Sequence, residues 1–128
     1  MKIRITSVPV DNQEKALQFY TEKLGFVKKT DVPAGEYRWL TVVSPDETDG
    51  VELLLEPMGF APAKTYQQAL YNAGIPYTSF QVQDMAKEKE RLEGLGVVFR
   101  SQPANIGPVV IAMIDDTCGN LIQLLQKV

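Results

Sequence analysis

The side chains in this sequence that could do chemistry are carboxylates, amides, lysines, tyrosines and a single cysteine, because histidine is absent. Histidine is the commonest ligand for transition metals and the side chain that titrates nearest neutral pH. Its absence removes the usual zinc, iron and copper sites and the nucleophiles that a histidine activates. Cys118 lies in a turn-like segment without a nearby base, which favours a structural role over a nucleophilic one.

Two polar residues each interrupt an apolar strand pattern. Residues 111–126 are typical of two strands joined by a turn, and Gln123 lies among aliphatic side chains in the second strand. An inward amide is costly without a partner, which favours a functional role for Gln123. Residues 51–54 repeat the pattern with Glu52 in place of Gln123, 71 residues earlier. For Glu52 the sequence leaves two interpretations open: a pocket carboxylate or a solvated strand residue.

Apolar periodicity and turn residues predict the elements that would position these side chains. Asp11 is expected to cap the first helix, which ends at Gly25, and Asp84 to cap the last one. A loop is expected over 101–108. The predicted helices span 13–24, 65–72 and 85–95, and the predicted strands span 2–10, 26–30, 37–44, 51–57, 77–83, 97–100, 111–114 and 121–126.

The order of these elements repeats as strand, helix and three strands. Residues 5–10 align with 77–82 at an offset of 72, and residues 24–27 align with 95–98 at an offset of 71. Such in-order landmarks at nearly one offset indicate a duplicated βαβββ unit. We therefore expect one α+β domain with module one at 1–58, a helical connector at 59–75 and module two at 76–128.

This tandem arrangement resembles the vicinal oxygen chelate (VOC) superfamily of glyoxalases, bleomycin resistance proteins and extradiol dioxygenases. Residues 11–26, DNQEKALQFYTEKLGF, are similar to the first helix of that family and its Leu-Gly-Phe stop. Residues 115–124, DDTCGNLIQL, are similar to its final hairpin. The resemblance implies an eight-stranded open cup, a homodimer and a small-molecule ligand.

In the enzymes of this family four side chains hold a divalent metal inside the cup. The resemblance puts those positions at Ile5, Glu52, Tyr77 and Gln123, of which only Glu52 is a strong ligand. It therefore implies a metal-free pocket without a cofactor. The expected ligand-binding residues are Glu52, Tyr77, Gln123, Ser7, Trp39 and Glu56, and no catalytic residue can be assigned.

Three functions remain open at this stage. The first is a protein that binds a small molecule in a metal-free cup, as in the bleomycin-resistance branch. The second is an enzyme that uses a divalent metal: a lyase or isomerase, such as a lactoylglutathione lyase, or a dioxygenase-like enzyme. Glu52, Gln123 and Glu56 would hold manganese or magnesium, because hard cations accept oxygen ligands. The third is a cup filled by side chains, with the dimer surface as the functional part. The facing of Trp39 decides whether it binds ligand or packs in the core.

Charge and hydropathy exclude other partners. A formal charge of −3 without a basic cluster argues against nucleic acid and anionic membranes. No segment approaches the roughly 18 apolar residues that a membrane span needs. The first residues, MKIRITSVPV, lack the features of a secretory signal, so we expect a cytoplasmic protein.

Overall fold

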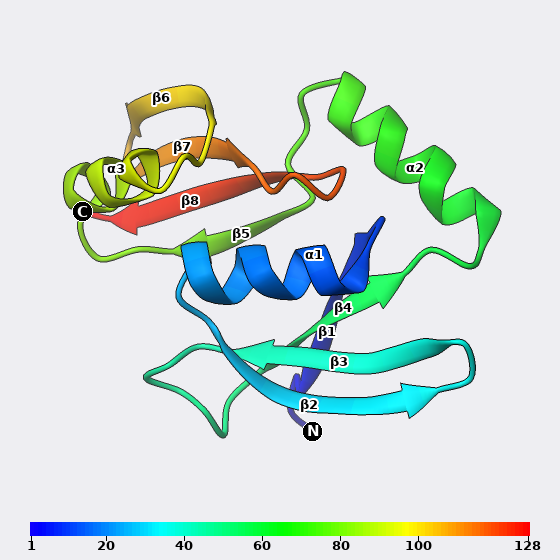
Figure 1. Ribbon diagram of the computed structural model, residues 1–128. Coiled ribbons are helices and arrows are strands. Elements are labelled where there is room, and N and C mark those ends of the chain that lie inside the picture. The colour runs from blue at the N-terminus through cyan, green and yellow to red at the C-terminus, as the bar shows by residue number, and fades with distance from the viewer. The chain divides into compact units, whose positions relative to one another are not determined.

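The computed structural model describes all residues, Met1–Val128 (Figure 1). The chain forms two compact units, Met1–Thr65 and Tyr66–Val128. Helix α2 (Ala61–Asn72) begins in the first unit and ends in the second. None of the helices is both long enough and apolar enough to cross a membrane.

The first unit contains a four-stranded sheet in the order β1-β4-β3-β2. The edge strand β1 runs parallel to β4, and the other neighbours are antiparallel. The strands are β1 (Ile5–Val10), β2 (Val27–Ala34), β3 (Tyr37–Val43) and β4 (Glu52–Pro57).

The second unit repeats this topology with the order β5-β8-β7-β6 and a parallel β5–β8 pair. Its elements are β5 (Thr78–Gln81), α3 (Met85–Gly94), β6 (Phe99–Ile106), β7 (Val109–Asp115) and β8 (Leu121–Lys127). The predicted α+β fold of two tandem βαβββ modules is therefore confirmed.

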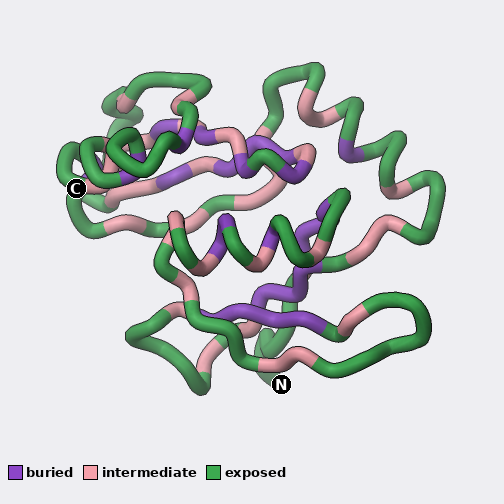
Figure 2. Tube along the Cα trace, in the orientation of Figure 1, coloured by how far each residue is buried: buried purple, intermediate pink, exposed green.

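One helix covers one face of the first sheet. It consists of α1 (Gln13–Gln18) and a π-helical turn, η1 (Phe19–Lys23), and ends at Gly25, whose φ of +88° suits glycine. Ala16, Phe19 and Tyr20 are buried, and the buried segments of Figure 2 run along the helix and the strands beneath it. Asn12, not Asp11, caps the helix, because its side chain accepts the Lys15 amide hydrogen bond at 3.0 Å.

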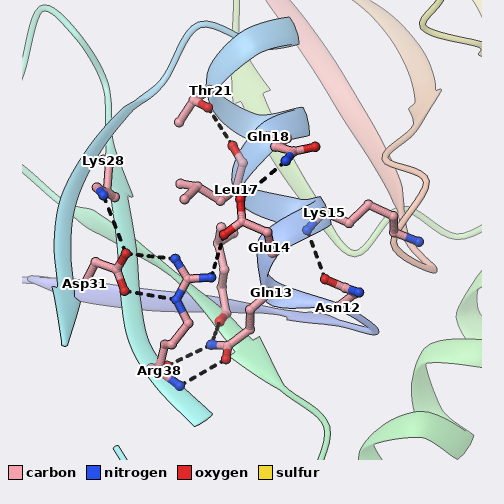
Figure 3. Close-up of polar contacts among 11 residues, drawn as sticks. Asn12, Gln13, Glu14, Lys15, Leu17, Gln18, Thr21, Lys28, Asp31 and Arg38 are labelled. Carbon is pink, nitrogen blue, oxygen red and sulfur yellow. Dashed lines mark hydrogen bonds and ion pairs between the residues drawn. The ribbon is translucent and has the colours of Figure 1, made fainter. Parts of the chain in front are cut away.

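Polar contacts fasten the start of this helix to the sheet (Figure 3). The Gln13 amide donates to the carbonyls of Arg38 (2.7 Å) and Leu55 (2.9 Å), and its oxygen accepts from the Arg38 amide (3.0 Å). The Arg38 guanidinium donates two hydrogen bonds to Asp31 on β2 and one to Glu14 on α1. This charge-assisted contact lowers the pKa of Asp31 and raises that of Arg38.

The second half of α2 is fastened to the second sheet by two side chains. Buried Gln67 donates to the Cys118 carbonyl (3.2 Å) and to Asn120 Oδ1 (3.1 Å) in the β7–β8 turn. Tyr71 donates to Asp115 at 2.5 Å, which raises the pKa of Tyr71, and Arg100 donates to the same hydroxyl. Cys118 is buried in this turn, which agrees with a structural role.

Several elements are longer than the sequence patterns predicted, among them β7, which spans Val109–Asp115 instead of 111–114. Strand β2 extends to Ala34, and β6 extends from Phe99 to Ile106 through the predicted 101–108 loop. Both are edge strands with register shifts, and an edge strand tolerates a proline such as Pro103 that a central strand would exclude. Helix α2 begins at Ala61 instead of residue 65, because Pro62 is tolerated in a first turn.

The Gln67 contact leads to a stability prediction for Gly119, whose φ is +101°. A Cβ added there would lie 2.7 Å from Gln67 Oε1, and Gln67 cannot move without losing its buried hydrogen bonds. Gly119→Ala should therefore cost about 2–5 kcal/mol, the sum of left-handed strain and overpacking. Gly107→Ala is the matched control, because Gly107 also has a positive φ, +60°, but nothing lies within 4 Å of its added Cβ.

Urea unfolding followed by circular dichroism measures both losses. We expect Gly107→Ala to lose only about 1–2 kcal/mol. Adding Gln67→Ala to Gly119→Ala should remove the steric part of the loss. Equal losses for the two glycine variants would contradict the proposed clash.

The Arg38–Asp31 contact predicts a pH-dependent contribution to stability. The pKa of Asp31 is depressed in the folded state, so the contribution is present above its unfolded value, near 3.8, and is lost as pH falls through the lower folded value. Arg38→Gln should be less stable than the parent protein at pH 7, and the difference should shrink at pH 3 and below. Asp31→Asn should show the same pH trend; a difference that stays constant from pH 7 to pH 2.5 would show that Asp31 is not responsible.

Candidate functional site

The face of the first sheet away from α1 carries most of the predicted site residues. Arg38 points toward α1, where it contacts Glu14, so its strand neighbour Trp39 points to the opposite face. The register continues this face across the sheet, pairing Trp39 with Val32, Ile5 with Glu52, and Ser7 with Leu54. The structure therefore shows which way Trp39 faces, which the sequence left open.

This face is apolar and uncovered within the first unit. Trp39 is 41% exposed, Ile5 44% and Val32 50%. Other parts of the face are closed, for example at Thr41, Leu54 and Val43, which are buried. Exposed apolar groups on one face, beside few polar groups, are typical of a surface that binds a ligand or a partner.

Glu52 is the polar group at the edge of this surface. Its Oε1 accepts a hydrogen bond of 2.7 Å from the Thr41 hydroxyl, and Thr41 Oγ1 in turn accepts from the Thr30 amide at 3.2 Å. Glu52 is half-buried and has no cationic partner in the chain. Thr41 therefore orients a carboxylate that can still accept a hydrogen bond from a ligand.

Ser7 and Glu56 lie on the same face as Glu52 but farther along the strands. Ser7 is half-buried beside Leu54, and Glu56 is exposed beside Pro9. Glu52 and Glu56 are four residues apart on one strand, which places their Cα atoms about 13 Å apart. They cannot act as a carboxylate pair or share one ion.

Gln123 occupies the corresponding face of the second sheet. Gln126 accepts a 2.7 Å hydrogen bond from the Met85 amide of α3, so Gln123, three residues earlier, points away from that helix. Its amide donates to the Ser79 hydroxyl at 3.0 Å, with Met113 on its other side. The carbonyl oxygen of Gln123 accepts no hydrogen bond within the protein and can accept one from a ligand.

Tyr77 is not the neighbour of Gln123 across the parallel β5–β8 pair. The sequence repeat had suggested that it would be, because it aligned Tyr77 with Ile5 and Gln123 with Glu52. Glu52 lies beside Ile5, whereas Gln123 lies beside Ser79, two residues further along β5. Tyr77 precedes β5, where its amide donates to the Leu121 carbonyl at 2.8 Å and its ring meets that of Tyr66 edge-on. The modules therefore share a topology but differ in the register of their parallel pair.

The donor atoms do not fit a zinc or iron centre. Ile5, the neighbour of Glu52, supplies no donor, and Thr41 already hydrogen-bonds one oxygen of the carboxylate. Nowhere in the chain do three Cys, Asp or Glu side chains come together in a way that could hold a metal ion. Zinc and iron sites need three or four strong donors, so we derive no chemistry through such an ion.

The sequence analysis missed two residues that orient side chains predicted to bind a ligand. Thr41 positions Glu52, and Ser79 positions Gln123. A signal for Ser79 existed, because the repeat aligns it with Ser7. No signal marked Thr41, whose role depends on the register between β3 and β4.

Comparison with known proteins agrees with this architecture. The family model described as Glyoxalase/Bleomycin resistance protein/Dioxygenase superfamily matches residues 2–124. The chain is 56% identical over 127 residues to YurT of Bacillus subtilis, covering 99% of this chain and 100% of YurT. It is 31% identical over 133 residues to a lactoylglutathione lyase of Neisseria meningitidis, covering 99% and 91% of the two chains.

A solved structure shows the same fold. The crystal structure of TnmS3, an antibiotic binding protein from Streptomyces, matches with a TM-score of 0.80 and 29% sequence identity. The match covers 100% of this chain and 97% of TnmS3. From the family match and the tandem βαβββ architecture together, we conclude that the chain belongs to the glyoxalase, bleomycin resistance protein and dioxygenase superfamily.

Proposed function

We propose that the protein binds a small molecule in a metal-free cup. The observation that carries the proposal is the Glu52 carboxylate, oriented by Thr41 and free of any cation, on the same face as exposed Trp39. The similarity to TnmS3, whose title names antibiotic binding, supports a small-molecule ligand.

The side chains on these faces favour a ligand with an apolar, planar body and a hydrogen-bond donor or positive charge. Trp39 offers an exposed ring on which a planar group can stack. Glu52 accepts the donor, and Gln123 offers a free carbonyl oxygen in the second sheet. Ser7, Tyr77 and Glu56 complete the proposed set of ligand-binding residues.

We also propose the domain organisation and assembly that the family resemblance implied. The two modules at 1–58 and 76–128, with the connector at 59–75, would form one domain that acts as a cytoplasmic homodimer. Sedimentation equilibrium measures the dimer directly. A bound ligand should shift the NMR signals of the Trp39 indole and of the Gln123 side-chain amide; the absence of any shift at either residue would contradict its proposed role in ligand binding.

A second candidate is a metal-dependent lyase, favoured by the identity of 31% to the Neisseria lactoylglutathione lyase. Glu52 would then provide an oxygen ligand to a magnesium or manganese ion, since hard cations do not need nitrogen donors. The 13 Å separation estimated from strand geometry excludes Glu56 from the same ion.

Trp39 is the only tryptophan of the chain, so its fluorescence reports ligand binding at this face. We expect a naphthylmethylammonium cation to change this fluorescence and to bind more tightly than neutral naphthylmethanol or anionic naphthoate. Glu52→Gln should weaken binding of the cation about ten-fold, since a hydrogen bond to a charged group contributes about 1.5 kcal/mol.

The control for this experiment is Glu47→Gln, which removes an exposed carboxylate from the β3–β4 loop. It should leave the affinity for the cation unchanged. Equal binding of the three naphthyl probes, or an equal effect of both variants, would overturn the role proposed for Glu52.

Bound metal distinguishes the two candidate functions. After incubation with manganese, magnesium, zinc or nickel and then dialysis, we expect less than stoichiometric metal and no metal-dependent turnover of a vicinal dicarbonyl panel. Stoichiometric metal that disappears in Glu52→Ala, accompanied by turnover, would replace the metal-free proposal with the lyase.

A further inference from the structure

The first unit contains a pocket of about 260 Å³ at the opposite end of β4 from Glu52. It is formed where β1 and β4 end and β3 begins, and Lys64 of α2 lies on its border. Glu52 is the first residue of β4 and Pro57, in the pocket wall, is the last, which separates their Cα atoms by about 16 Å. The pocket is therefore distinct from the Glu52 site.

Two of the polar groups in the pocket wall are already occupied by the fold. Gln13 uses both amide donors and its oxygen in the contacts with Arg38 and Leu55. Asp11 pairs with Lys15 at 3.0 Å. These groups form part of the wall and keep a negative charge at its edge.

The Lys64 ammonium and the Tyr37 hydroxyl are the polar groups that remain available. Neither makes a hydrogen bond or an ion pair within the protein, although both border the same pocket. The Tyr37 hydroxyl lies over Gly59, where an added Cβ would be only 3.1 Å from it. An ammonium and a phenol hydroxyl are both donors, and together they suit a carboxylate.

The rest of the wall is apolar. Val10 is 1% exposed, and Pro57 and Met58 are half-buried. The volume lies just below the roughly 300 Å³ at which pockets for drug-sized ligands begin, so the pocket suits a molecule of a few heavy atoms. A short hydrocarbon chain would lie against these three residues, and the Asp11 carboxylate would disfavour a second negative charge.

We propose that this pocket is a second ligand site, which binds a short aliphatic monocarboxylate through Lys64 and Tyr37. The carboxylate receives hydrogen bonds from the ammonium and the phenol, and the hydrocarbon chain contacts Val10, Pro57 and Met58. The proposal is independent of the function assigned to Glu52, since the two sites share none of these groups.

An NMR titration of the ¹⁵N-labelled full chain with sodium butyrate tests this site. We expect saturable shifts for the amides of Met58, Gly59 and Lys64, and no comparable shifts at Glu52. Lys64→Gln and Tyr37→Phe should each weaken binding at least five-fold. Lys127→Gln, which removes an exposed lysine at the end of β8, is the matched control and should leave the affinity unchanged.

Three further probes decide the chemical class of the ligand. Butyramide has the same chain without the charge, succinate adds a second carboxylate, and 2-aminobutyrate adds an ammonium that could pair with Asp11. Butyrate should bind most tightly of the four. Equal shifts with butyramide, tighter binding of succinate or 2-aminobutyrate, or shifts that persist in Lys64→Gln would each overturn the proposal.

Discussion

The contact on which the first unit depends is the polar attachment of α1 to one face of its sheet. Gln13 bonds two neighbouring strands at once, and Arg38 joins β2 to the helix. A shift of the helix along the sheet would leave buried donors and acceptors unpaired, and each unpaired group costs about 1–3 kcal/mol. The helix is thus fixed to one face, and the position of Trp39 and Glu52 on the other face follows from strand alternation.

The second unit reaches the same arrangement through different contacts. Its helix α3 is bonded to Gln126 of β8, and the β7–β8 turn is held by Gln67 from α2. In both units the residue that faces away from the helix near the start of the last strand is polar: Glu52 in one and Gln123 in the other. In both units a hydroxyl from a neighbouring strand bonds that residue. The duplication has therefore preserved the topology and a polar position, while the residues at this position have diverged.

The sequence was sufficient for the architecture because its signals are local and repeated. Gly25 and Gly96 end helices at matching places, and the strand patterns recur at nearly one offset. It was not sufficient for register, which depends on contacts between distant segments. The pairing of Gln123 with Ser79 instead of Tyr77, the contact between Thr41 and Glu52, and the length of the edge strands β2 and β6 all depend on such contacts.

The same dependence on distant contacts explains why the sequence predicts the fold better than the chemistry of the site. A βαβββ module tolerates many side chains on its uncovered face, because packing against the helix stabilises only the other face. In this chain the uncovered face has Ile5 beside Glu52, so a single carboxylate remains where a transition metal would need several donors. A lone acceptor and an exposed indole farther along the same face can still select a ligand by hydrogen bonding and stacking. Selection of this kind needs no reaction.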